Sequence, residues 1–237
     1  MAVLVLRLAG PLQSWGISSK FNTRESGTEP SKSGVIGMIA SAMGRRRTDS
    51  IEDLAALRFG VRKDQEGRII EDFHMAHIPE GAHNKVNSYL THRYYISDAI
   101  FLAALEGDRK MLEKIEEAIK SPVFPLYLGR RSCPPSGRVS MGIVEGNLEE
   151  VLNGFEWQAN EWYRKRMNEE VRLEIVVDSD GGDEQLDDVP ISFDQSKRTY
   201  LRRFVERKIM KEGIVNPQKL RRTDHDAMAE LNSEGTP

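Results

Sequence analysis

The N-terminal part of the chain carries two apolar patterns, a short continuous run and a helical stripe. The run Val3–Leu8 predicts a buried strand, and glycine and proline residues interrupt it soon afterwards. A helix is predicted from Ser31 to Gly44, with Ser31 or Ser33 capping its start and Gly44 ending it. Its buried face carries Val35, Ile39 and Ala42.

Apolar and polar residues alternate over positions 57–62, as in a half-buried strand. A turn at 63–67 and a returning segment at 68–75 predict a hairpin with this strand. Residues 76–92 show no clean period, so we expect a long excursion from the sheet there. The β-branched and aromatic residues of 93–105 predict another strand.

A second helix is predicted after Gly107 and Asp108, and residues 123–128 predict one more strand. The buried stripe of this helix is Leu112, Ile115 and Ile119. The resulting order is β-α-β-β-α-β. It predicts an α+β fold with a ferredoxin-like sheet and two packed helices, the architecture of RNA-recognition domains.

The second half of the chain is expected to be smaller and β-rich. Strands are predicted at 138–144, 171–178 and 189–193, a short helix at 147–152 and an acidic loop at 178–188. We therefore divide the chain into a core over residues 1–140, a β-rich portion over 141–215 and a flexible polar tail over 216–237.

Composition places the protein among globular domains rather than membrane or disulfide-rich proteins. Of its 237 residues 39% are hydrophobic and 30% charged, and its single cysteine fits a reducing compartment. No apolar run approaches the ~18 residues of a membrane span, and the first residues lack a basic leader and a cleavage site. We expect a cytoplasmic protein with no membrane partner.

The net charge of −3 hides a strong segregation of charge along the chain. Three blocks are basic, and one is acidic. The blocks are 1–47 (+5), 121–140 (+3), 196–222 (+8) and 145–190 (−10). This pattern suggests one face that binds a polyanion and another that repels it, although solvated surface charge is the simpler alternative.

Cys133 lies in the sequence LYLGRRSCPPSGR and could be a nucleophile or part of a stiff loop. A nucleophilic cysteine needs a nearby base, and no histidine is close in sequence. Pro134 and Pro135 limit the backbone freedom of the loop, which lowers the entropic cost of ordering Arg130 and Arg131. We interpret Cys133 as a structural thiol.

Asp72, His74 and His77 are a candidate metal set, but zinc sites have four ligands in paired spacing. On a strand, positions 72 and 74 share a face that position 77 does not. The sequence also lacks a Walker loop and a GxGxxG motif. We therefore predict no metal site and no cofactor.

Several groups of residues have the chemistry of an RNA site. Arginine and lysine suit phosphates, and aromatic rings or guanidinium planes stack on bases. The start of the first predicted helix is a candidate phosphate-binding site, because its backbone amides and dipole attract anions. The candidates are Gln13, Ser14, Trp15, Arg24, Ser31, Lys32, Ser33, Arg45, Arg46, His92, Arg93, Tyr94, Arg130 and Arg131.

The motifs resemble, in order, the Cas-five family in its type I-E form, the CasD-type subunits of CRISPR Cascade complexes. The matching segments are LRLAGPLQSWG, PSKSGVIGMIASAMG, RFGVRKDQEG, DFHM, RYYISDAIF, PLYLGRRSCPPS and VPISFD…RTYLRR. The resemblance covers roughly residues 2–210.

This resemblance implies a repeat-associated RNA-binding protein (RAMP) that holds the 5′ handle of the CRISPR RNA without catalysis. Its neighbours would be the large subunit and the first backbone subunit, and target DNA would be reached only through the complex. The excursion at about 75–93 would be a protruding thumb that kinks the RNA, with Arg93 as its first contact.

Two other functions stay open. A related type I-C branch cleaves repeat RNA, and His74, Lys85 and Tyr94 could supply a base and donors for metal-independent cleavage. Alternatively, the basic patches could meet acidic protein partners in a scaffold without RNA, and the salt dependence of RNA binding would separate these cases.

Overall fold

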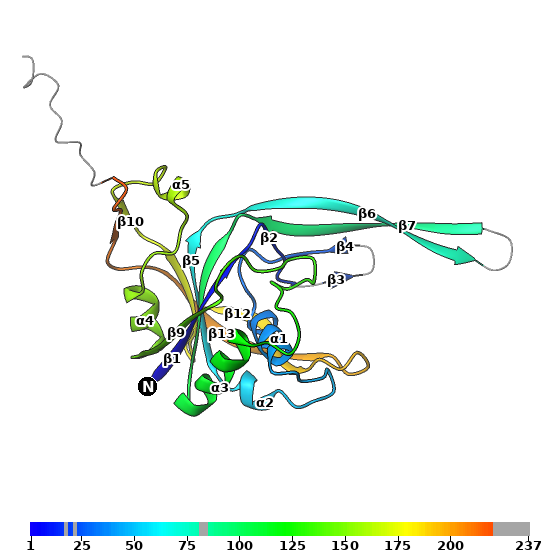
Figure 1. The fold of residues 1–237 in the computed structure, drawn as a ribbon, viewed down its shortest axis with the longest axis horizontal. Coiled ribbons are helices and arrows are strands. Elements are labelled where there is room, and N and C mark those ends of the chain that lie inside the picture. The colour runs from blue at the N-terminus through cyan, green and yellow to red at the C-terminus, as the bar shows by residue number, and fades with distance from the viewer. Residues whose placement is uncertain (17–18, 21–22, 81–84, 220–237) are drawn as a thin grey trace, which may run out of the picture.

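The computed structural model describes residues 1–16, 19–20, 23–80 and 85–219. The fold is α+β and dominated by β-sheet (Figure 1). The helices are α1 (Lys32–Ala42), α2 (Glu52–Ala55), α3 (Arg109–Lys120), α4 (Leu148–Gly154) and α5 (Glu161–Arg164). In the described part of the chain, no helix has the length and apolar character needed to cross a membrane.

The main sheet has seven strands, and every neighbouring pair in it is antiparallel. Its strands are β1 (Ala2–Ala9), β5 (Arg58–Gln65), β8 (Ile100–Gly107), β9 (Ser140–Glu145), β11 (Glu174–Asp178), β12 (Glu184–Ser192) and β13 (Thr199–Ile209). They lie in the order β12-β13-β11-β5-β8-β1-β9.

A second sheet consists of β2 (Leu12–Gln13), β3 (Ser19–Lys20), β4 (Thr23–Arg24), β6 (Arg68–Glu80) and β7 (Lys85–Ser97). A separate two-stranded sheet pairs β10 (Glu170–Val171) with β14 (Ile214–Val215).

Along the chain, β1, α1, β5, β8, α3 and β9 follow the expected β-α-β-β-α-β order. The last strand is not the predicted 123–128 segment, however, because that segment forms no strand. Pro122 and Pro125 lack backbone donors and disfavour a ladder there. β9 takes that place in the sheet beside β1.

The observed helices agree well with those predicted from the sequence. Ser31 is the N-cap of α1, its hydroxyl accepts a hydrogen bond from the Gly34 amide, and Gly44 has the left-handed φ of +77° expected after a helix end. The buried residues of α3 are the three predicted ones, Leu112, Ile115 and Ile119. Asn147 caps α4, which confirms the short helix.

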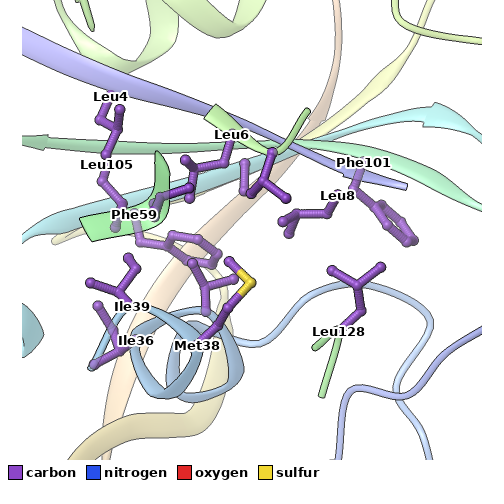
Figure 2. Packing of buried hydrophobic residues seen from close by; sticks show 14 of the residues in the cluster. Leu4, Leu6, Leu8, Ile36, Met38, Ile39, Phe59, Phe101, Leu105 and Leu128 are labelled. Carbon is purple, nitrogen blue, oxygen red and sulfur yellow. The ribbon is translucent and has the colours of Figure 1, made fainter. Parts of the chain in front are cut away.

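β1 is buried on both faces of the main sheet. Leu4, Leu6 and Leu8 point toward α1 and α3, where they pack with Phe59 and Phe101 (Figure 2). On the other face, Val3 and Val5 belong to a second core under α4 and Trp157. Because both faces are buried, the sequence of β1 is a continuous apolar run and does not alternate between apolar and polar residues.

Residues 76–80 and 85–92 of the expected excursion are regular strand, so the prediction of a segment without regular structure is wrong there. β6 and β7 pair in a continuous antiparallel ladder from Arg68↔Ser97 to Glu80↔Lys85. This β6–β7 hairpin extends away from the main sheet (Figure 1). The sequence does not reveal this hairpin, because its described side chains at 73–75 and 88–90 are exposed. Burial therefore imposes no alternation of apolar and polar residues there.

Two strand predictions around this hairpin are also corrected. β5 pairs with β8 and β11, so the hairpin expected between 57–62 and 68–75 does not form. The single strand expected at 93–105 is two strands, β7 and β8. Asp98, with a φ of +57°, turns the chain between them.

The C-terminal half extends the main sheet. The division expected at residue 140 falls at the start of β9, and strands from both sides of it share one sheet. Much of the expected acidic loop, from Glu184 onward, is strand β12, and β13 was not expected. Most of the expected tail, from residue 220, lies outside the described residues.

A buried ion pair fastens the segment after α4 to β5. Arg62 and Asp64 are fully buried and paired at 2.6 Å. Arg62 also donates to the carbonyls of Leu152, Phe155 and Glu156. Asp64 in turn accepts from the Gln158 amide at 2.6 Å. Arg62 therefore satisfies the carbonyls at the end of α4 that have no partner within the helix.

We expect Arg62→Met to lower the free energy of unfolding by about 3–5 kcal/mol, because it leaves Asp64 buried without its cation. Urea unfolding measures this change. Arg172→Met is the control, since Arg172 forms an exposed pair with Glu170 and should contribute less than about 1 kcal/mol. Equal losses in the two variants would contradict the structural role of Arg62.

Candidate nucleic-acid interface

The loop that contains Cys133 is fixed to the segment after β1 by backbone contacts. The Ser14 amide donates to the Leu128 carbonyl at 3.1 Å, and the Leu128 amide donates to the Cys133 carbonyl at 2.7 Å. A turn closes where the Cys133 amide donates to the Arg130 carbonyl at 2.9 Å. Arg130 and Arg131 lie on this turn, which the backbone hydrogen bonds hold in place.

Gly129 makes this close docking possible. Its φ is +83°, and a Cβ at this position would lie 1.7 Å from the Ser14 carbonyl oxygen. Position 129 therefore excludes any side chain, because its backbone is left-handed and a Cβ atom would clash with Ser14.

Arg130 holds a central position between the loop and the second sheet. Its guanidinium lies 4.7 Å from the centre of the Tyr95 ring, and its Nη2 donates to the Arg24 carbonyl at 2.8 Å. Burial raises the pKa of the Tyr95 phenol, but hydrogen bonds from Ser132 and Arg130 outweigh it and lower that pKa. The Tyr95 ring thus lies under the Arg130 guanidinium and supports it.

Four arginines come together here, which we call the arginine cluster: Arg24, Arg93, Arg130 and Arg131. β4 and β7 are parallel neighbours, and Arg24 lies beside Arg93 in their register. Arg130 bonds to the backbone of Arg24, and Arg131 is exposed next to it. Residues from three distant parts of the chain thus form one basic surface.

Two nitrogens of the arginine cluster are unsatisfied. Arg93 Nε and Arg130 Nη1 are shielded from solvent and have no hydrogen-bond partner in the described part of the chain. Leaving a buried charged donor unpaired costs about 1–3 kcal/mol. A phosphate bound at the exposed side of the cluster would offset the repulsion among the guanidinium groups.

Gln13, Ser14 and Trp15 support the interface instead of facing it. Gln13 Nε2 donates to the carbonyls of Leu8 and Ala99, and its Oε1 accepts from the Trp15 indole at 3.0 Å. Ser14 donates to the Tyr94 carbonyl. All three are buried, so they offer no exposed surface for RNA and the prediction of direct contact is corrected.

The expected phosphate-binding site at the start of α1 is already occupied by the carboxylate of Asp188. The Lys32 amide donates to Asp188 Oδ2 at 2.7 Å, and Lys32 Nζ pairs with Asp178 at 3.0 Å. Ser31 is used as the helix cap, with Ser33 beside it. The Lys32 amide and ammonium group are thus already paired within the chain, whereas an RNA contact of Ser31 and Ser33 stays a prediction.

The basic residues after α1 lie apart from the arginine cluster. Arg45 forms a two-bonded ion pair with Asp53, both distances being 2.5 Å. The Asp53 hydrogen bond raises the pKa of the Arg45 guanidinium and lowers that of Asp53. Arg46 is exposed beyond the end of the helix, and nothing brings it to the cluster.

His92 and Tyr94 lie on the opposite face of the β6–β7 hairpin from Arg93, because successive strand residues alternate. His92 Nδ1 is 2.5 Å from Glu71 Oε1. Desolvation, followed by the charges of Glu71 and Glu25, raises the pKa of Tyr94. Near the main sheet, this face therefore carries the Glu71 carboxylate and no arginine.

The strongly basic block at 196–222 forms no free basic surface over β13. Arg202 pairs with Asp187, Arg203 with Asp178 and Asp188, and Lys208 with Glu149 and Glu206. Arg207 contacts Glu29, Glu174 and Glu184, and these hydrogen bonds raise its pKa, that from Glu29 most. Along β13, the basic and acidic blocks therefore pair with each other instead of forming separate faces.

The residues considered for RNA cleavage do not meet. His74 and Tyr94 lie on opposite faces of the hairpin, since their ladder partners are Thr91 and Glu71. Along β7, the Lys85 and Tyr94 backbones are separated by nine residues, or about 30 Å. This arrangement gives no shared site for a base and a donor.

Metal binding finds no support in the geometry either. Asp72 and His74 share a face, His77 points the other way, and its Nδ1 lies 2.9 Å from the Ser88 hydroxyl. Within residues 1–16, 19–20, 23–80 and 85–219, no group of three or more potential ligands gathers to hold a metal ion.

Cys133 has the environment of a structural thiol. It is fully buried in the core that includes Leu128 and Val139. Burial raises the pKa of this thiol, and the weaker opposing influences of Ser132 and Arg130 do not reverse the shift. A thiolate nucleophile is therefore disfavoured at this position.

The chain is similar to CRISPR-associated proteins in sequence and in structure. Residues 3–206 match the family described as CRISPR-associated protein (Cas_Cas5). The CRISPR system Cascade subunit CasD of Escherichia coli (strain K12) is 31% identical over 163 residues, which cover 61% of this chain and 72% of that protein.

Two solved structures are also similar. The first, described as the crystal structure of a Cas protein, has 34% identity and a TM-score of 0.69, over 91% of this chain and 96% of the other. The second, from a CRISPR RNA-guided surveillance complex, has 29% identity and a TM-score of 0.75, over 89% and 91%. The chain belongs to the Cas5 family of CRISPR-associated proteins, as its motifs indicated.

We expect Gly129→Ala to destabilise the protein more than Gly137→Ala. Both glycines have a left-handed φ, which costs alanine about 1–2 kcal/mol, but only Gly129 would also clash with Ser14. Urea unfolding should show a loss of about 3 kcal/mol or more for Gly129→Ala. Similar losses for both would mean that the loop moves freely away from Ser14.

Cys133 should react slowly with thiol reagents in the folded protein. Because its pKa is raised, the thiolate fraction at pH 8 is below that of a free cysteine, and burial also blocks access. We expect labelling at pH 8 to be at least roughly tenfold slower than in urea, and to accelerate above pH 9. Equal rates in the folded and unfolded chain would restore Cys133 as a candidate nucleophile.

Proposed function

We propose that this protein is a non-catalytic CRISPR RNA-binding subunit of a type I-E Cascade surveillance complex, acting in antiviral defence. It holds the 5′ handle of the CRISPR RNA and caps the backbone of the complex. Its protein neighbours are the large subunit and the first backbone subunit, and it reaches target DNA only through the assembly.

The observation that carries this proposal is the arginine cluster with its unsatisfied nitrogens. Arg24, Arg93, Arg130 and Arg131 converge from β4, β7 and the Gly129 loop. Phosphates, like carboxylates, are anions that guanidinium groups bind with paired hydrogen bonds. A single-stranded handle offers such phosphates together with bases that can stack on arginine or tyrosine.

The fold supports the same function. The strands β5-β8-β1-β9 with α1 and α3 are a ferredoxin-like core of the RAMP type, and β6–β7 is the thumb. The similarity to CasD and to a chain of an RNA-guided surveillance complex favours a Cascade role. The separation of His74 from Tyr94 and the burial of Cys133 argue for binding without cleavage.

Arg24→Ala/Arg93→Ala should weaken the binding of repeat RNA by the purified chain by roughly tenfold to a hundredfold at low salt. Loss of two phosphate contacts should also reduce the slope of log affinity against log salt by about 1.4. Fluorescence anisotropy with end-labelled RNA measures both values, and gel analysis of the same RNA reports cleavage.

Arg172→Ala provides the control, because this exposed arginine lies on the loop before β11, away from the arginine cluster. We expect it to bind RNA like the wild type. Equal affinities for all three proteins would remove the cluster from the RNA site. Site-specific cleavage of the repeat without metal would instead support the endoribonuclease alternative.

A further inference from the structure

The groups that hold Arg130 in place distinguish it from other ordered arginines of this chain. Arg203 and Arg207 are fixed by carboxylates, so the groups that order these cations also neutralise them. The groups that anchor Arg130 are uncharged. Its guanidinium lies 4.7 Å from the centre of the Tyr95 ring, and its Nη2 donates to the Arg24 carbonyl at 2.8 Å. Arg130 is thus anchored by groups that leave its positive charge available.

The Tyr95 ring is a fixed surface for this contact. Only 5% of Tyr95 is exposed, and its side chain belongs to the core that also contains Leu128 and Cys133. The next residue of β7, Ile96, pairs with Gln13 of β2, so a neighbouring strand holds the backbone at this point. Because the core holds the ring, the guanidinium packed on it is restricted as well.

The phenol end of Tyr95 contacts the same turn that carries Arg130. Burial raises the pKa of this phenol, but hydrogen bonds from Ser132 and Arg130 more than offset the increase and lower it. The turn therefore meets the tyrosine at two points, the ring and the hydroxyl. Of these two contacts, the ring is the one that a phenylalanine would preserve.

Anchoring matters for affinity because an arginine side chain is long and flexible. Immobilising one such side chain on binding weakens a complex by roughly twofold to tenfold. Arg130 has met this cost during folding, since Tyr95 and the backbone of Arg24 set its orientation before a ligand binds. A cation–π contact attracts the guanidinium, yet a neutral ring does not compete with phosphate for the charge as a carboxylate does.

We propose that Tyr95 is a positioning residue for RNA binding. Its ring holds the Arg130 guanidinium in the orientation that meets a phosphate of the RNA, without neutralising the cation and without touching the RNA itself. This inference rests on the proposed function for the identity of the ligand, but the order of the Arg130 side chain is measurable without RNA.

The test replaces Tyr95 by leucine in the full chain, in the wild-type background and in an Arg130→Ala background. Fluorescence anisotropy with end-labelled, single-stranded repeat RNA gives the four affinities. We expect Tyr95→Leu to weaken binding by roughly threefold to tenfold in the wild-type background and by less than about twofold when Arg130 is absent. Tyr95→Phe keeps the ring and should bind within about twofold of the wild type.

Phe59→Leu is the matched control, because Phe59 is a buried ring of the main sheet that also lies under an arginine. The Arg203 guanidinium is 5.4 Å from the centre of the Phe59 ring, but Asp178 and Asp188 pair with this arginine. RNA affinity should be unchanged in this variant. Circular dichroism and thermal unfolding report whether each variant is folded, and Tyr95→Met, which fills the space without a ring, replaces a leucine variant that does not fold.

The order of the Arg130 side chain provides a second readout that needs no RNA. Nitrogen relaxation of arginine Nε groups measures side-chain motion on the picosecond-to-nanosecond timescale, and Arg130→Lys identifies the Arg130 signal by its loss. We expect the order parameter of Arg130 Nε to fall in Tyr95→Leu and to be retained in Tyr95→Phe and Phe59→Leu.

Four outcomes would overturn the proposal. Tyr95→Leu could bind RNA like the wild type, or it could leave Arg130 as ordered as before. Equal losses of affinity with and without Arg130 would make the role of Tyr95 purely structural. An equally large loss in Tyr95→Phe would assign the effect to the phenol instead of the ring. If the wild type fails to bind RNA, the proposed function fails, while the Nε relaxation still decides whether Tyr95 holds Arg130.

Discussion

Two carboxylates, Asp178 and Asp188, connect the N-terminal helix of this protein to its C-terminal strands. Asp178 accepts from Lys32 Nζ, Arg203 and the Phe59 amide, and Asp188 accepts from Arg203 and the Lys32 amide. Two cations balance two anions in a largely buried site, so each charge depends on the others for its solvation. This network joins α1, β5, β11, β12 and β13 into one body, and it occupies the helix end that would otherwise attract phosphate.

With that anion site closed and the charges of β13 neutralised by acidic neighbours, the arginine cluster is left as the basic surface suited to RNA. Its like charges are held together by groups that carry no charge themselves: the Gly129 backbone against Ser14, and the ring of Tyr95 under Arg130. Natural proteins accept such local repulsion where function requires it and offset it by stability elsewhere. In this chain the buried networks around Asp178 and Arg62 supply that stability.

The sequence predicted the parts of this arrangement that local physics determines. Capped, periodic helices such as α1 and α3 were found nearly to the residue, but the last strand of the expected β-α-β-β-α-β order was placed at 123–128 instead of at β9. Contacts between distant segments were not accessible, because no pattern in the chain indicates that Asp188 reaches Lys32 across 156 positions. The β6–β7 hairpin was missed for another reason, since a strand pair without a core beneath it need not alternate. Within the candidate site, Arg24, Arg93, Arg130 and Arg131 were named from residue type, whereas the burial of Gln13 and Trp15 required the fold.

The placement of β1 has a consequence for synthesis of the chain. β1 is made first, but its partners β8 and β9 begin only at Ile100 and Ser140. At ~5–20 residues per second, about 5–20 s pass before synthesis reaches β8 and about 7–28 s before it reaches β9. During that interval an apolar strand with both edges open is available to other nascent chains. Because both of its partners come from later in the chain, β1 can be paired along both edges only once most of the protein has been made, which favours late folding and protection by chaperones.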